Sequence, residues 1–213
     1  MDKMKKVGLF GGSFDPPTKA HLQVAEQLIE RGVLDEVEFV PAYMSYHGKD
    51  YGATPQQRID MLYLLIESSK YRDNMTVNTF EIDNKMKSST CDFVVKFLDE
   101  HDIFFSRKYY FIIGADNAKK IPNFINAEKL ISLIPFIIVN RGSENLDNLD
   151  WCNNDNTHTI VNIGEGVKNI SSSYIRECIY NIESKGLPVE FNRLCSMNVF
   201  AYILNYQLYG LEE

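Results

Sequence analysis

The sequence predicts an α/β protein with a Rossmann-like, doubly wound parallel sheet, helices on both faces and a small C-terminal helical portion. Two apolar runs, at 109–113 and 136–139, lack the polar alternation of a half-exposed strand. Segments with helical spacing separate such runs, which is typical of parallel strands buried on both faces. A glycine pair follows the first apolar run, where the backbone can turn and approach a ligand. For 213 residues we expect a single domain over 1–213.

The predicted elements alternate between strands and helices. After a strand at 4–10, Thr18 begins a helix whose apolar face includes Leu22 and Leu28. Thr54 and Pro55 supply an N-cap and a first-turn proline for another helix. The other predicted elements are strands at 37–41, 75–77, 109–113, 136–139 and 159–163 and a helix at about 91–99. The polar stretch 142–159 is predicted to be a long surface loop.

Residues 11–21, with the sequence GGSFDPPTKAH, carry the strongest functional signal. Gly11 and Gly12 have no Cβ, so the backbone can turn sharply and approach a ligand there. The helix that begins at Thr18 directs its free N–H groups and the positive end of its dipole to that turn, which favours an anion such as a triphosphate. Thr18 and His21 then share one side of the first helical turn. The alternative is an ordinary strand–turn–helix with a solvated His21.

Two further segments follow predicted strands and would reach the same edge of a parallel sheet. Gly114 and Asp116 come directly after 109–113, where an aspartate can accept hydrogen bonds from a ribose or meet a metal. A serine run that begins a helix consists of Ser171, Ser172 and Ser173. Arg176 projects on the same side as these serines, and its fork of donors suits phosphate. The alternatives are a structural turn and a simple serine cap.

Composition argues against several classes of function. A net charge of −7 disfavours sequence-independent nucleic-acid binding, because neutralising phosphates requires clustered Lys and Arg. No stretch resembles a membrane span or a signal peptide, so we expect a cytoplasmic protein that binds neither membrane nor nucleic acid. A nuclear location and a homo-oligomer stay open. The four cysteines lack C-x-x-C or zinc-ligand spacing, which predicts buried free thiols and no metal site made of protein side chains.

Together the three segments resemble the motifs of the nicotinate/nicotinamide mononucleotide adenylyltransferases, a branch of the nucleotidyltransferase superfamily. Residues 11–21 are similar to G-G-[ST]-F-D-P…[HT]-x-G-H, 112–117 to a G-x-D motif and 170–176 to I-S-S-[ST]-x-I-R. The resemblance implies ATP-dependent adenylyl transfer to nicotinamide or nicotinate mononucleotide, with Mg²⁺ bound mostly through nucleotide oxygens. Two rivals are transfer to another phosphate acceptor, such as phosphopantetheine, and a nucleotide-binding module without turnover.

The resemblance also implies roles for single residues. The implied catalytic residues are Thr18, His21 and Arg176, with His21 hydrogen-bonding the phosphate where charge develops. The implied ATP-binding residues are Gly11, Gly12, Ser13, Phe14, Gly114, Asp116, Ser171, Ser172, Ser173 and Arg176. The implied mononucleotide-binding residues are His47, Lys49, Thr90, Phe124 and Arg141. Phe124 stands where many relatives have a tryptophan that stacks on the pyridine ring, and its alternative is a core position on an apolar helical face.

Overall fold

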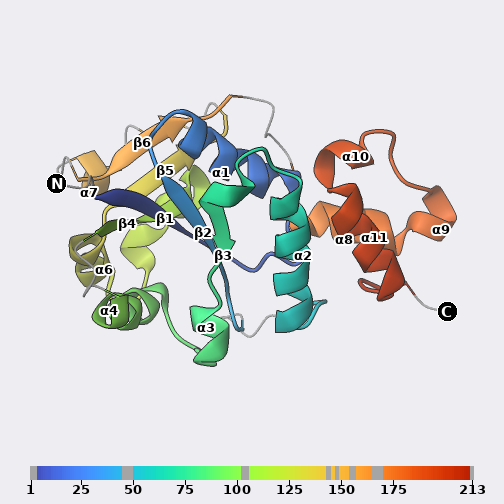
Figure 1. The fold of residues 1–213 in the computed structure, drawn as a ribbon, viewed down its shortest axis with the longest axis horizontal. Helices are drawn as coiled ribbons and strands as arrows, with labels where there is room; N and C mark the ends of the chain where they lie inside the picture. The colour runs from blue at the N-terminus through green and yellow to red at the C-terminus, as the bar shows by residue number, and fades with distance from the viewer. Residues whose placement is uncertain are drawn as a thin grey trace.

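The computed structural model describes residues 4–44, 50–101, 106–142, 145–146, 149–153, 157–164 and 170–211. Within these residues six parallel strands form one sheet in the order β3-β2-β1-β4-β5-β6 (Figure 1). The strands are β1 (Lys5–Gly12), β2 (Glu36–Pro41), β3 (Met75–Val77), β4 (Arg107–Gly114), β5 (Phe136–Asn140) and β6 (Thr159–Asn162). The order reverses between β1 and β4, as in a doubly wound sheet. The predicted fold class is thereby confirmed.

Helices cover both faces of the sheet and create two hydrophobic cores. The first core lies under the helices α1 (Lys19–Glu30), α2 (Pro55–Glu67), α8 (Ser172–Tyr180), α10 (Phe191–Leu194) and α11 (Met197–Asn205). The second lies under α3 (Phe80–Asp83), α4 (Thr90–His101), α5 (Ala115–Ala118), α6 (Ala127–Leu133) and α7 (Asp150–Asn153). Neighbouring strand residues divide between the cores, because successive side chains point to opposite faces. Ile112 belongs to the first core and Phe111 to the second.

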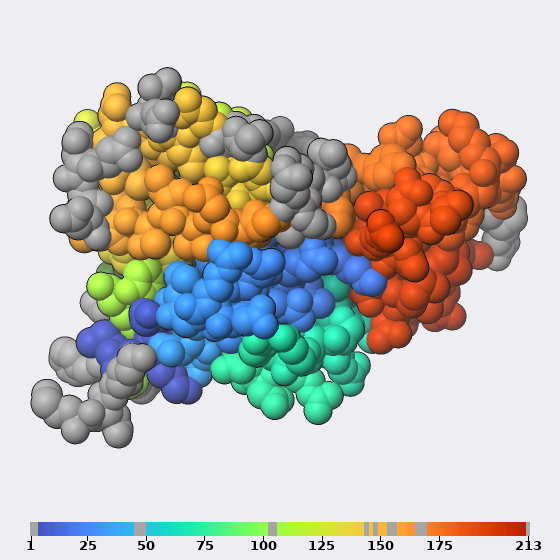
Figure 2. Space-filling model, turned by 90° about the horizontal axis from the view of Figure 1, so that it is seen from above, coloured from blue at the N-terminus to red at the C-terminus, as the bar shows by residue number. Residues whose placement is uncertain are grey.

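The last helices form a group of their own beside the sheet. Figure 1 shows α8, α9 (Ile182–Lys185), α10 and α11 together at one end of the molecule, next to α2. In Figure 2 the same group stands beside the N-terminal segments. This group is the predicted C-terminal helical portion. It brings residues beyond position 170 against the loop that follows β1, as the hydrogen bond from the Ser172 hydroxyl to the Pro16 carbonyl oxygen (2.8 Å) shows.

Local sequence signals account for the helix starts. The predicted cap of α2 is confirmed: the Gln57 N–H donates to the Thr54 hydroxyl (3.3 Å), and the Thr54 N–H donates to the Gln57 side-chain carbonyl (2.8 Å). Pro55 occupies the first helical position, where no hydrogen bond is lost. The four cysteines are buried free thiols, as predicted. No helix in the described part of the chain is long and apolar enough to cross a membrane.

One expectation about the fold was wrong. The stretch 142–159, predicted as a surface loop, contains the short helix α7 at Asp150–Asn153. Leu149 and Cys152 are buried in the second core, and the Trp151 indole N–H donates to the Ala118 carbonyl oxygen (3.2 Å). The many asparagines of this stretch made it look uniformly polar. Its few apolar residues nevertheless gain enough from burial to pack against β5 and α5.

The central strand supplies a test of the packing. A Cβ added to Gly8 of β1 would lie 2.4 Å from Leu34 Cδ1 and 2.6 Å from Ile112 Cδ1, both in fully packed core side chains. We therefore expect Gly8→Ala to lower the free energy of unfolding in urea by about 1–3 kcal/mol. The matched control is Gly164→Ala, because a Cβ there has nothing within 4 Å. Equal unfolding free energies for the two variants would contradict this packing.

Candidate active site

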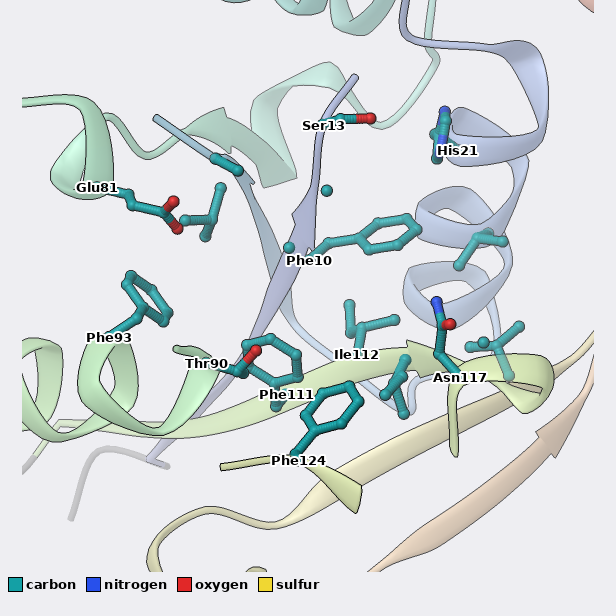
Figure 3. Close-up of a pocket in the computed structure, with 18 of the residues that line it drawn as sticks. Phe10, Ser13, His21, Glu81, Thr90, Phe93, Phe111, Ile112, Asn117 and Phe124 are labelled. Atoms are coloured by element: carbon teal, nitrogen blue, oxygen red, sulfur yellow. The ribbon is translucent and has the colours of Figure 1, made fainter. Parts of the chain in front are cut away.

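A cavity of about 460 Å³ opens where the carboxyl ends of β1 and β4 meet. The order of the strands reverses between β1 and β4, and we call this point the crossover. Ligands of open parallel sheets bind at such a point, since the loops after the two strands leave in opposite directions. Figure 3 shows the cavity spanning both sides of β1, with Ser13 and His21 on one side and Glu81 and Phe93 on the other. The cavity therefore has two parts, one beside α1 and one beside α3 and α4.

The part beside α1 is built from the glycine loop. Gly11, Gly12 and Ser13 line it, together with His21 from the first turn of α1. A Cβ on Gly11 would lie 3.2 Å from Cζ of Phe111, which also lines the cavity. Glycine at position 11 thus leaves room for the Phe111 ring and exposes backbone to a ligand.

Thr18 fixes the orientation of His21. The Thr18 N–H donates to Nδ1 of His21 (3.0 Å), and the Thr18 hydroxyl lies 3.0 Å from the same nitrogen. In return the His21 N–H donates to the Thr18 hydroxyl (3.4 Å), so the two residues form a capping box at the start of α1. Because Nδ1 accepts a backbone N–H, the neutral ring carries its proton on Nε2.

The surroundings also fix the charge of His21. Burial, and after it the positive charge of Arg141, lower the pKa of His21 to about 4. The imidazole is therefore neutral at physiological pH and acts as a hydrogen-bond donor through Nε2. The rings of Phe10 and Phe14 pack edge-on against it, at centroid distances of 5.9 and 5.1 Å. A neutral donor with one orientation can bind a phosphate oxygen without proton transfer.

Three residues at or just after the carboxyl ends of β4 and β5 close the same part of the cavity. Gly114, Asp116 and Arg141 all line it. A Cβ on Gly114 would lie 2.7 Å from Oδ1 of Asp116 and 3.8 Å from Nη2 of Arg141, so both side chains converge over this glycine. A carboxylate and a guanidinium at one edge can serve ribose hydroxyls and phosphate, respectively.

Aromatic side chains form the part beside α3 and α4. Phe93, Phe111 and Phe124 line it with Thr90, the first residue of α4 (Figure 3). The alternative interpretation of Phe124, a core position, required an apolar helical face at this residue. The structure shows no helix there. Phe124 follows the 3₁₀ turn Ile121–Asn123 in extended backbone, is partly buried, and also lines an adjoining cavity of about 380 Å³. Its ring is thus a wall between two cavities.

The residues of the serine segment lie outside this cavity, against the loop between β1 and α1. Ser171 caps α8 by accepting the Tyr174 N–H (3.2 Å). Arg176 donates through Nη1 to the Asp15 carbonyl oxygen and through Nη2 to the Ser173 hydroxyl (3.1 Å). The side chain of Phe14 is buried in the first core, and Thr18 is fully buried. His47 and Lys49 lie outside the described residues.

Two residues of the site went unnoticed in the sequence. Arg58 of α2 is fully buried and donates to the Ser13 carbonyl oxygen and the Ala42 carbonyl oxygen, both at 2.7 Å, so it ties the ends of β1 and β2 together. Its position at helical spacing from Met61 and Leu65 was an available signal, because an arginine on an apolar face needs buried partners.

Glu81 of α3 had no comparable signal. Its carboxylate lines the cavity and accepts the Tyr43 N–H (2.9 Å). Burial raises the pKa of Glu81 to about 7, against the opposing effects of that hydrogen bond and of the Arg58 charge. Nothing in the four residues of α3 distinguishes this glutamate from a solvated one.

The described residues contain no group of three or more His, Cys, Asp or Glu side chains that could hold a metal ion. Asp116 is a carboxylate that lines the cavity beside Gly114. This donor set fits a hard cation such as Mg²⁺ that takes most of its ligands from phosphate oxygens and water.

Comparison with known proteins identifies the family. The cytidylyltransferase-like family model matches residues 9–178. A protein of Listeria monocytogenes serotype 4a named "probable nicotinate-nucleotide adenylyltransferase" is 32% identical over 206 residues, which are 96% of this chain and 97% of that relative. A Bacillus licheniformis protein of the same name is 29% identical and covers 97% of this chain and 99% of its own.

Solved structures agree on the fold. The Plasmodium falciparum nicotinic acid mononucleotide adenylyltransferase complexed with NaAD matches with a TM-score of 0.82 at 23% identity, covering 98% of both chains. The same enzyme complexed with APC matches with a TM-score of 0.80 at 23% identity, again covering 98% of both chains. The three motifs, the crossover cavity and the full-length relatives agree, and the chain belongs to the cytidylyltransferase-like family and, within it, to the nicotinate-nucleotide adenylyltransferases.

Proposed function

We propose that this chain transfers the adenylyl group of ATP to nicotinate mononucleotide, forming the dinucleotide and releasing pyrophosphate. The observation that carries the proposal is the two-part cavity at the β1–β4 crossover. One part offers a glycine loop and a neutral histidine suited to phosphate, and the other offers aromatic walls suited to a pyridine ring. A single cavity can thus hold both nucleotides with their phosphates adjacent.

The reaction is a direct displacement at the α-phosphorus of ATP. A phosphate oxygen of the mononucleotide forms the new P–O bond, and the bond from the α-phosphorus to the oxygen bridging to the β-phosphate breaks. The mononucleotide phosphate is itself the nucleophile, so orientation and charge stabilisation are what the protein must supply. We assign His21 to the α-phosphate: its Nε2–H would hydrogen-bond an oxygen on which negative charge accumulates.

The start of α8 is assigned to the rest of the triphosphate. Arg176 is partly buried, with its side chain 24% exposed, and two of its five N–H groups are used within the protein. The others are free to bind phosphate, together with N–H groups at the start of α8. Mg²⁺ would be held mainly by the phosphates near Asp116 and would neutralise charge on the departing pyrophosphate.

The acceptor is assigned to the part of the cavity beside α4. Phe124 would stack on the pyridine ring, and Thr90 would present the N-terminal end of α4 to the ring's carboxylate. Arg141 lies near Gly114 and lines the cavity, and we assign it to the phosphate of the mononucleotide. His47 and Lys49, outside the described residues, remain proposed ligands of the acceptor phosphate.

Pyrophosphate release with ATP, Mg²⁺ and a panel of acceptors tests the proposal. Nicotinate mononucleotide should give the highest kcat/KM, followed by nicotinamide mononucleotide. Turnover with phosphopantetheine and none with either pyridine nucleotide would reassign the acceptor. ATP binding without turnover on any acceptor would leave a nucleotide-binding module.

The role of His21 predicts a large effect on turnover. His21→Ala removes one preorganised donor to the developing charge, so kcat should fall by a factor of about 10² to 10³ while the Kd of ATP changes little. Steady-state kinetics and calorimetric ATP titration measure the two quantities. His101→Ala, at the far end of α4, is the control and should retain the wild-type kcat. A wild-type kcat in folded His21→Ala would remove this residue from the mechanism.

The role of Arg176 predicts a loss of ATP affinity. Arg176→Ala should weaken ATP binding by about 1.5–3 kcal/mol, the contribution of a charge-assisted hydrogen bond. Arg193→Ala, an exposed arginine on α10, is the matched control and should bind ATP normally. Calorimetry decides, since unchanged ATP affinity in Arg176→Ala would reduce the start of α8 to a structural cap.

The role of Phe124 predicts selectivity between substrates. Phe124→Ala should raise the KM of the mononucleotide by an amount equivalent to about 1–3 kcal/mol, as for loss of base–aromatic stacking, and leave the KM of ATP nearly unaltered. Phe93→Ala is a useful comparison, because Phe93 is buried in the second core and its loss should lower stability as well. A Phe124→Ala protein that melts early with an unaltered mononucleotide KM would refute the stacking role.

A further inference from the structure

The loop between β1 and α1 is hydrogen-bonded to a segment that lies nearly two hundred residues later in the chain. The carboxylate of Asp15 is buried, with the residue 2% exposed. Its Oδ2 accepts the Gly52 N–H (3.0 Å), and its Oδ1 accepts the Ala53 N–H (3.1 Å) and the Tyr209 hydroxyl (3.0 Å). Asp15 thus joins the glycine loop to the start of α2 and to the segment after α11.

The backbone of the same loop contacts the start of α8. The Asp15 carbonyl oxygen accepts from Nη1 of Arg176, and the Pro16 carbonyl oxygen accepts from the Ser172 hydroxyl (2.8 Å). Nη1 of Arg176 also lies 3.9 Å from Oδ2 of Asp15. A shift of Asp15 would therefore move the guanidinium that the proposed function assigns to the triphosphate.

The segment after α11 is shaped to bring Tyr209 to this loop. The chain turns back as the Leu208 N–H donates to the Ile203 carbonyl oxygen (3.0 Å), and the Leu208 side chain is buried in the first core. Gln207 and Tyr209 both have positive φ angles, +50° and +66°, which side chains other than glycine adopt at a cost. With these two strained backbone positions, the segment places the Tyr209 hydroxyl on Asp15.

The tyrosine ring is tightly packed and its hydroxyl remains a donor. A Cβ on Gly52 would lie 2.6 Å from Cδ1 and 2.8 Å from Cε1 of Tyr209, so the ring rests directly on the Gly52 backbone. Burial, and after it the charge of Asp15, raise the pKa of Tyr209 well above its usual range. The hydroxyl therefore keeps its proton at physiological pH and can always donate to Asp15.

We propose that Tyr209 is a positioning residue for ATP: its hydroxyl fixes Asp15, and the carbonyl groups of Asp15 and Pro16 in turn hold Arg176 and Ser172 in place at the triphosphate site. The inference rests on the proposed function, which assigns Arg176 and the start of α8 to ATP. It adds that the segment after α11, although it lines no part of the cavity at the crossover, sets the affinity of that cavity for one of its two substrates.

The chain offers a matched control for this claim. The hydroxyl of Tyr202, on α11, donates to Oδ2 of Asp60 on α2 at 2.8 Å. This second tyrosine–aspartate hydrogen bond also joins the C-terminal helices to the rest of the chain. Neither partner contacts the loop between β1 and α1 in any hydrogen bond that the structure describes, and neither lines the cavity at the crossover. Loss of the two hydroxyls should therefore differ in its effect on ATP.

The experiment compares Tyr209→Phe with Tyr202→Phe in the full chain. Tyr209→Phe should raise the Kd and KM of ATP about five- to twentyfold and leave the mononucleotide KM within about twofold, since one hydrogen bond to a charged group is lost. Tyr202→Phe should leave both KM values at wild type. Wild-type ATP affinity in Tyr209→Phe, or the same loss in Tyr202→Phe, would overturn the proposal, whatever happens to the melting temperatures.

A second variant keeps the test decisive if Tyr209→Phe fails to fold. Gly52→Ala pushes the Tyr209 ring away from the loop and should give the same ATP-selective loss. In the double variant the two losses should not add, because both break one link. Additive losses would contradict a shared pathway. Calorimetric ATP titration needs no turnover, so it measures the effect of Tyr209 even if the proposed reaction does not occur. Failure of the proposed reaction would instead appear as absent turnover in the wild type, so the two failures are distinguishable.

Discussion

The parallel pairing of β1 with β4 is the interaction on which the site depends. In this register Phe10 lies opposite Ile112, so Gly11 and Gly12 emerge at the same sheet edge as Gly114. The loop after β1 leads to α1 on one face of the sheet, whereas the chain after β4 supplies residues that close the cavity. Neither segment fills the space between the ends of the two strands. The glycines keep this space open, and His21, Asp116, Phe124 and Arg141 line it.

Burial of polar groups gives the site its fixed shape and charge. His21 is neutral and has one tautomer because its ring is enclosed and its Nδ1 accepts a backbone N–H. Arg58 and Asp15 are buried charges that hydrogen-bond to backbone groups of the loops around the cavity. Such groups are costly to bury alone, and their hydrogen bonds to backbone groups offset part of that cost and hold the loops in place. The buried charges of Arg58 and Asp15 therefore hold the loops proposed to bind phosphate in one conformation.

Local sequence signals were sufficient to predict the fold and the part of the site beside α1. Apolar runs and caps predicted the strands and helix starts, and the glycine loop predicted an anion site beside His21, where the structure has a cavity. The partners of Asp15 were beyond reach, because Gly52, Arg176 and Tyr209 meet only after the chain has folded. The sequence around Tyr209 in particular does not indicate that its hydroxyl reaches Asp15. The aromatic wall at Phe124 could be suspected, but only the tertiary structure separates a cavity wall from a core position.

The central claim is that one cavity joins ATP and nicotinate mononucleotide through their phosphates. The most direct measurement uses ATP labelled at the α-phosphorus, incubated with the chain, Mg²⁺ and nicotinate mononucleotide, and follows the label by chromatography. The account predicts that the label appears in nicotinate adenine dinucleotide in an amount equal to the unlabelled pyrophosphate released. Label that stays in ATP, or that accumulates as AMP while the mononucleotide is unchanged, would contradict it.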